Sequence, residues 1–254
     1  MYIHNLDPIA FKILNFSIYW YSLSYLFGFI FSFFYAKFLI QKGYVKLNFS
    51  YFEDFLSWAV VSVIIGGRLG YIFFYNLNFY SENPLFILKI WEGGMSFHGG
   101  LLGLIFSIFL YSKLKKIDFI ELSNLVSACA PFGLFLGRIA NFVNKELVGK
   151  PTDSNWGVLF IENDVLRHPS QLYESLFEGL VLFFLILYFF FKNYHKFVNI
   201  FAVFLIFYGL SRFALEFYRE PDQHIGYIFQ NFSMGQLLSF PMIIIGIVLL
   251  RYKK

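Results

Sequence analysis

Seven long apolar runs constrain this chain more than any other feature. A helix of roughly 20 apolar residues spans the hydrocarbon core of a bilayer. The composition fits such spans, because 58% of the 254 residues are hydrophobic and only 14% are charged, and a water-soluble fold has no interior for so much apolar surface. We therefore predict one all-α, polytopic integral membrane domain covering residues 1–254, with spans at about 17–40, 54–75, 96–112, 118–142, 170–191, 198–218 and 234–250.

Basic residues flank these runs unevenly, which predicts the orientation. Lys and Arg collect on the cytoplasmic side of membrane proteins. Only six basic residues fall on one side: Lys12, Lys89, Lys145, Lys150, Arg167 and Arg219. Eleven of the 20 fall on the other: Lys37, Lys42, Lys46, Lys113, Lys115, Lys116, Lys192, Lys196, Arg251, Lys253 and Lys254. The N-terminus is expected outside and the C-terminus in the cytoplasm. The net charge of +4 then records topology, and we expect no nucleic-acid partner.

Three arginines, Arg68, Arg138 and Arg212, fall inside the predicted spans. A charged side chain is costly there and usually marks a functional site. The predicted orientation places them in the outward-facing half of the bilayer, together with five further polar residues: Tyr21, His98, Asn141, Glu146 and Glu216. We interpret the arginines as cations that carboxylates in the spans do not fully match, so they should bind an anion. A lipid phosphate suits them, because the planar guanidinium holds phosphate through two hydrogen bonds.

Other interpretations of these residues stay open at this point. Arg212 and Glu216 are four positions apart on one helix face and can simply form an internal ion pair. Tyr21 can belong to the interfacial aromatic belt, and His98 can be a hydrogen-bonded packing residue. Near the start of the second span, Ser50 followed by Glu53 has the pattern of a capping box.

Several motifs carry a family resemblance. Residues 137–149 (GRIANFVNKELVG) resemble the defining motif of bacterial prolipoprotein diacylglyceryl transferases. Further stretches similar to this family follow in the expected order from about Trp20 to the last span: 66–71 (GGRLGY), 91–100 (WEGGMSFHGG), 167–174 (RHPSQLYE), 208–213 (YGLSRF), 216–222 (EFYREPD) and 233–236 (SMGQ).

The resemblance implies a seven-span enzyme of the bacterial inner membrane, with its active site toward the outer face. It would move the diacylglyceryl group of phosphatidylglycerol onto the lipobox cysteine of a preprolipoprotein, forming a thioether and releasing glycerol phosphate. We expect a monomer that uses no cofactor and no metal. Asn124 stands where the family's aspartate is expected, which puts a structural contact in doubt more than the reaction. The family's functionally sensitive positions are matched by Tyr21, His98, Arg138, Asn141, Glu146, Gly149, Arg212 and Glu216.

The resulting hypothesis gives each residue a role. Arg138 and Arg212 hold the lipid phosphate, with Arg68 and Gly99 also expected in the lipid site, and Asn141, Glu146 and Glu216 hold the arginines in place. His98 is the candidate base for the thiol, Tyr21 orients thiol or phosphate, and Gly149 belongs to the lipid-binding set. The alternatives are a transporter or channel for an anionic metabolite and a non-catalytic lipid-binding protein.

Overall fold

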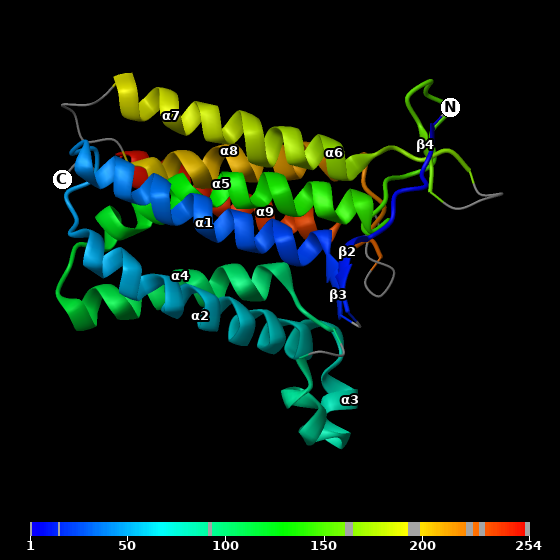
Figure 1. Ribbon diagram of the computed structural model, residues 1–254, viewed down its shortest axis with the longest axis horizontal. Coiled ribbons are helices and arrows are strands. Elements are labelled where there is room, and N and C mark those ends of the chain that lie inside the picture. The colour runs from blue at the N-terminus through cyan, green and yellow to red at the C-terminus, as the bar shows by residue number, and fades with distance from the viewer. Residues whose placement is uncertain are drawn as a thin grey trace. The chain divides into compact units, whose positions relative to one another are not determined.

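The structure is a computed structural model that describes residues 2–14, 16–90, 93–160, 165–192, 199–221, 226–228 and 232–251. Most of them are helical (Figure 1). The α-helices are α1 (Trp20–Gln41), α2 (Phe49–Tyr75), α3 (Leu77–Glu82), α4 (Phe97–Lys115), α5 (Phe119–Val143), α6 (Ser170–Glu174), α7 (Leu182–Lys192), α8 (Ile200–Leu215) and α9 (Met234–Arg251). A short 3₁₀ turn, η1 (Pro84–Leu88), follows α3, and a π-helical segment, η3 (Ser175–Val181), joins α6 to α7.

Each of the seven predicted spans coincides with a helix, α6, η3 and α7 forming one continuous rod. Five of these helices are long and apolar enough to cross a membrane, namely α1, α2, α5, the α6–α7 rod and α9. Helix α8 is apolar but has only 16 residues. The all-α class is therefore confirmed, and the chain is a multi-pass membrane protein.

The second span begins earlier than predicted and is capped differently. Helix α2 starts at Phe49, and Asn48 is its N-cap, since the Asn48 side chain accepts a hydrogen bond from the backbone N–H of Ser50. The predicted capping box of Ser50 and Glu53 is wrong, because Asn48 is an equally good cap two residues earlier.

The described chain divides into two compact units, Ile40–Ser123 and the remainder (Met1–Leu39 with Asn124–Lys254). In the unit of Ile40–Ser123, α2 and α4 run side by side (Figure 1). Glycines make this contact unusually close: a Cβ on Gly66 would lie 2.9 Å from the Cα of Gly103, and one on Gly70 would lie 2.6 Å from the Cα of Gly99. Small residues that let helix backbones touch are typical of helix pairs in membranes.

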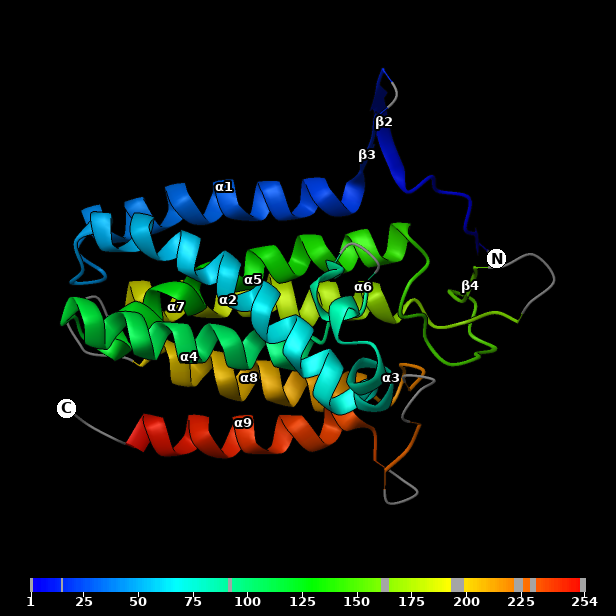
Figure 2. The ribbon, with the colours of Figure 1, turned by 90° about the horizontal axis from the view of Figure 1, so that it is seen from below.

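The larger unit contains α1, α5, the α6–α7 rod, α8 and α9, which lie roughly parallel (Figures 1 and 2). The first turn of α8 is capped by Asn199 and also by Asn124 of α5, whose side-chain oxygen accepts from the N–H of Phe201 at 2.9 Å. Asn124 is buried. The amide therefore makes a structural contact that the sequence had left in doubt.

Four short strands gather at one end of this larger unit, where α1 begins and α5 ends (Figure 1). β1 (Tyr2–Ile3) pairs in parallel with β4 (Val158–Leu159), and β2 (Ile9–Ile13) pairs antiparallel with β3 (Phe16–Tyr19). These strands were not predicted, because segments of two to five residues carry little periodic signal.

Candidate active site

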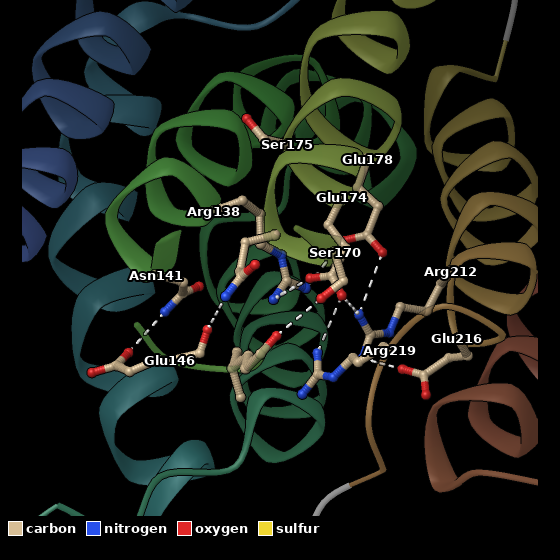
Figure 3. A network of polar contacts seen from close by, with 12 residues as sticks. Arg138, Asn141, Glu146, Ser170, Glu174, Ser175, Glu178, Arg212, Glu216 and Arg219 are labelled. Carbon is tan, nitrogen blue, oxygen red and sulfur yellow. Dashed lines mark hydrogen bonds and ion pairs between the residues drawn. The ribbon is translucent and has the colours of Figure 1, made fainter. Parts of the chain in front are cut away.

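Charged side chains from three helices meet inside the larger unit (Figure 3). Arg138 of α5 lies between two glutamates of the α6–α7 rod, with its Nη1 2.8 Å from Glu174 Oε2 and its Nη2 3.0 Å from Glu178 Oε2. Both glutamate side chains are fully buried, and that of Arg138 is 10% exposed. A guanidinium bridging two carboxylates in this way is held in one orientation.

Arg212 of α8 binds the same two carboxylates. Its Nη1 lies 3.1 Å from Glu174 Oε1 and 3.5 Å from Glu178 Oε1, and its Nη2 pairs with Glu216. Arg219, beyond α8, adds a third cation at 3.4 Å from Glu174 Oε1. The six residues Arg138, Arg212, Arg219, Glu174, Glu178 and Glu216 are called the charge cluster below.

The charge cluster brings three arginines and three glutamates together, so its formal charges cancel when all six are ionised. The expectation that carboxylates in the spans do not match the arginines is therefore wrong for Arg138 and Arg212. The internal pair of Arg212 with Glu216 is confirmed. A buried charge needs such partners, because an isolated ion in a low-dielectric interior costs several kcal/mol.

The local sequence explains how the two central glutamates reach the arginines. Glu174 and Glu178 are four residues apart, and the π-helical turn that begins at Ser175 keeps both on the face toward α5 and α8. Gly179 lets this turn touch α5, since a Cβ there would lie 2.6 Å from the Cα of Phe135. Single π-helical turns inside α-helices often mark functional sites.

A second polar group lies beside the charge cluster, at the last turn of α5 and just after it (Figure 3). Asn141 donates from Nδ2 to Glu146 Oε2 at 3.0 Å, and Asn144 donates to the other oxygen at 3.3 Å. Tyr21, half-buried near the start of α1, has its hydroxyl 3.2 Å from that of Tyr25 and lies close enough to Glu146 and Arg138 to be influenced by their charges. The structure thus brings Tyr21, Asn141 and Glu146 to the end of the larger unit that holds the arginines.

Gly149 and Gly235 have packing reasons to be glycine. A Cβ on Gly149 would lie 2.7 Å from the Cβ of His168 and 2.8 Å from the carbonyl oxygen of Tyr218, where the segments before α6 and after α8 meet. A Cβ on Gly235 would lie 2.6 Å from the carboxyl carbon of Glu216. Both glycines therefore support the site by close approach.

Arg68 belongs to the other unit and has different partners. All five of its N–H groups donate to backbone carbonyls of the segment after α3, those of Phe86, Ile87, Lys89, Gly93 and Gly94. Its guanidinium also lies 5.1 Å from the ring centroid of Tyr80. These contacts tie the segment of residues 86–94 to α2.

His98 and Gly99 open α4 in the same unit. Ser96 caps this helix by accepting a hydrogen bond from the N–H of Gly99 at 3.2 Å, and His98 is half-buried. Gly99 is pressed against α2, where a Cβ would lie 2.8 Å from the Cα of Gly70. Arg68, His98 and Gly99 therefore form one neighbourhood along α2 and α4, and their approach to the charge cluster stays a prediction.

Comparison with known proteins identifies the family. The family model described as "Prolipoprotein diacylglyceryl transferase" matches residues 8–252. The chain belongs to the prolipoprotein diacylglyceryl transferase family. Proteins named phosphatidylglycerol–prolipoprotein diacylglyceryl transferase are 47% identical to it in Rickettsia felis (95% of each chain) and 46% identical in Rickettsia typhi (97% of this chain and 96% of the relative). The resemblance predicted from the motifs is confirmed, and the transporter alternative receives no support.

Three members of the charge cluster, Glu174, Glu178 and Arg219, were not predicted as site residues. Arg219 was noted only as a basic residue outside the spans and as part of a motif. Glu174 was noted only as part of a motif and Glu178 not at all, although two acids four residues apart inside a long apolar run are the kind of signal that marked the arginines. Parts of two predicted motifs, Trp91 with Glu92 and Asp222, lie outside the described residues.

Proposed function

We propose that this chain transfers the diacylglyceryl group of phosphatidylglycerol to the lipobox cysteine of a preprolipoprotein, forming a thioether and releasing glycerol phosphate. The relatives are named for phosphatidylglycerol and prolipoprotein, at 46–47% identity over nearly the whole chain. The observation that carries the proposal is the meeting of Arg138 and Arg212 on one pair of buried carboxylates.

The proposed topology is seven spans in the bacterial inner membrane, with the charge cluster toward the outer face. Within the larger unit, Lys37, Lys192 and Arg251 lie near the ends of α1, α7 and α9 at the end opposite the strands (Figure 1). In the other unit, Lys115 near the end of α4 pairs with Asp54 near the start of α2. Within each unit, these basic residues mark the end that we propose as cytoplasmic, by the positive-inside rule.

The two arginines bind and stabilise the lipid phosphate. The thiolate sulfur attacks the glycerol carbon and breaks the bond between that carbon and the phosphate oxygen. The phosphodiester carries one negative charge, whereas the glycerol phosphate that leaves is a monoester whose charge approaches two. Donors already oriented toward that oxygen stabilise the growing charge without reorganising. Glu174, Glu178 and Glu216 hold the Arg138 and Arg212 guanidiniums together at the proposed phosphate site.

The thiol must lose its proton before attack, because the thiolate is the nucleophile. We assign the base to His98, whose unperturbed titration range lies near neutrality. Tyr21, which interacts with Glu146 and Arg138, orients the thiol or the phosphate. Glu216 holds Arg212 directly, and the Asn141–Glu146 pair supports the loop after α5.

Three residues keep supporting roles in this proposal. Gly149 and Gly99 shape the lipid site through backbone packing, since neither position has room for a Cβ. Arg68, whose N–H groups are all used, positions the segment after α3 rather than holding the phosphate itself. The preprolipoprotein signal peptide and its lipobox are the second substrate, and we propose that the enzyme acts as a monomer.

The test is a transfer assay with purified protein, labelled phosphatidylglycerol and a synthetic lipobox peptide. The expected product is a peptide heavier by one diacylglyceryl group, with free glycerol phosphate in equal amount. Arg138→Ala should abolish the product and His98→Gln should lower it. Full activity in Arg138→Ala, or lipid binding by the unmodified protein with no thioether, would exclude the proposed reaction.

A further inference from the structure

Glu178 is the most weakly held carboxylate at the centre of the charge cluster. Its Oε2 pairs with Arg138 at 3.0 Å, but among the described residues its Oε1 has only Arg212 Nη1 in ion-pair range, at 3.5 Å. Glu174, one turn earlier, has guanidinium nitrogens at 2.8, 3.1 and 3.4 Å from its two oxygens. The two carboxylates therefore compete for the same arginines, and Glu174 holds them better.

Binding of an anionic lipid disturbs the balance of the charge cluster. Three arginines and three glutamates cancel, so a phosphodiester arriving at Arg138 and Arg212 adds one uncompensated negative charge to a buried site. An uncompensated charge in such surroundings is removed most easily by a change of protonation. The charged and titratable groups facing Glu178 are Arg138 of α5, Glu174 of α6, and Arg212 and Tyr208 of α8.

We propose that Glu178 is a positioning residue that gives up its negative charge when the phosphate binds. A proton from water adds to the Glu178 carboxylate, forming an O–H bond, and Arg138 Nη2 turns from the neutral carboxyl to the phosphate oxygen. No bond of the lipid changes in this step, and the proton returns to water when glycerol phosphate leaves. The inference rests on the proposed function, since it needs a lipid phosphate at these arginines.

Proton uptake makes lipid binding depend on pH. If one proton is bound with each lipid, the binding constant falls by up to about tenfold per unit of rising pH over the linked range. The phosphodiester itself stays ionised throughout. Replacing Glu178 by glutamine supplies a permanently neutral group of the same shape, so the linkage should disappear and binding above neutral pH should tighten.

The experiment measures binding of fluorescent phosphatidylglycerol to the full chain in nanodiscs between about pH 5.5 and 8.5, with diacylglycerol as the uncharged probe. The wild type should bind phosphatidylglycerol at least about fivefold more weakly at the upper pH, while diacylglycerol binding stays flat. E178Q should lose this slope. The matched control is E220Q, which removes a carboxylate paired with Arg167 and 44% exposed, and which should keep it. Histidines titrate in all variants, so the difference between E178Q and E220Q isolates Glu178.

Two outcomes would overturn the inference: a wild-type slope that E178Q retains, or equal binding at all pH values in the wild type. If E178Q does not fold, two further measurements test the inference. The wild type in weak buffer should take up protons when phosphatidylglycerol is added, and E178D, which keeps a carboxylate, should keep the pH slope. Thioether formation is scored separately. A wild type that makes product without a pH slope removes this inference alone, whereas one that makes none removes the proposed function.

Discussion

Arg138 and Arg68 are two buried arginines whose sequence settings are alike and whose partners are not. Each follows a glycine in a long apolar helix. As whole residues, Arg138 is 8% exposed and Arg68 is 4% exposed. Arg138 faces carboxylates of the α6–α7 rod, whereas Arg68 donates all five N–H groups to backbone carbonyls. A helix sequence with a single arginine does not reveal which of these environments it will meet.

The difference separates binding from scaffolding. A carboxylate and a phosphate are both anions, so one can replace the other at Arg138, especially where a carboxylate can be neutralised. Backbone carbonyls cannot leave Arg68 without unfolding the segment that carries them, and each unsatisfied donor would then cost about 1–3 kcal/mol. Arg138 therefore suits an exchangeable ligand, and Arg68 suits a fixed loop.

The largest expected effect contrasts the two arginines in catalysis. Arg138→Lys keeps the charge but loses the fork that spans Glu174 and Glu178, so diacylglyceryl transfer should fall by roughly 10²–10³-fold. Arg68→Lys should lower transfer by less than about tenfold, because its contacts are structural. Initial rates with a lipobox peptide measure both. Equal losses of activity in the two variants would contradict the assignment of ligand binding to Arg138 and a structural role to Arg68.

The next effect concerns the stability of the charge cluster. Glu174→Gln leaves Arg138, Arg212 and Arg219 without their shared carboxylate and should lower the free energy of unfolding by roughly 3–5 kcal/mol. Glu220→Gln, which breaks a partly exposed pair with Arg167, should cost no more than about 1 kcal/mol. Unfolding in detergent gives both values, and similar losses would mean that burial does not decide the strength of these pairs.

A smaller effect is expected where Arg68 holds its loop. Lysine has three N–H donors in place of five, so Arg68→Lys should cost roughly 2–3 kcal/mol and loosen the segment after α3. Hydrogen exchange should rise at the amides of residues 85–88 and at Gly93 and Gly94, while α5 and α8 stay protected. Faster exchange in α5 instead would show that Arg68 supports the charge cluster.

Much of this fold could be predicted from the sequence, because each span carries its own apolar signal. All seven predicted spans fall on helices, and the family followed from motifs within them. The start of α2 was misplaced because both Asn48 and Ser50 can cap a helix, and only the loop geometry selects Asn48. The β2–β3 hairpin was missed because its strands are too short to show a period.

The site was less predictable than the fold. The depth of Arg138 and Arg212 along their helices could be predicted, but partners are tertiary contacts between segments about 40 residues apart. Glu178 lies in a π-helical turn, which the apolar pattern of the sequence does not reveal. The sequence could indicate that charged residues gather at one end of the spans. Only their positions in the structure show which arginine pairs with which glutamate.

The smallest expected effect extends the comparison to a third buried basic side chain, His4, whose burial disfavours the charged form. It is 3% exposed, its Nε2 donates to the carbonyl of Phe142 at 2.8 Å, and its ring stacks on Phe160. Burial, with a smaller contribution from Lys145, lowers the pKa of His4 below its ordinary value of 6.5. The unfolded chain therefore binds a proton more readily, so this residue's contribution to stability is present above about pH 6.5 and is lost as the pH falls below it.

His4→Gln tests this assignment because it removes the titrating ring and keeps a donor for Phe142. The wild type should lose stability between about pH 6.5 and 5 more steeply than the variant, measured as the shift of the unfolding midpoint. His168, whose pKa burial also lowers, is present in both proteins and cancels in the difference. Identical pH profiles would mean that His4 accepts a proton as easily folded as unfolded. The protein would then tolerate protonated His4, a buried cation with neither a carboxylate nor a set of carbonyls around it. The partners of Arg138 and Arg68 would in that case not be explained by the cost of burying a charge.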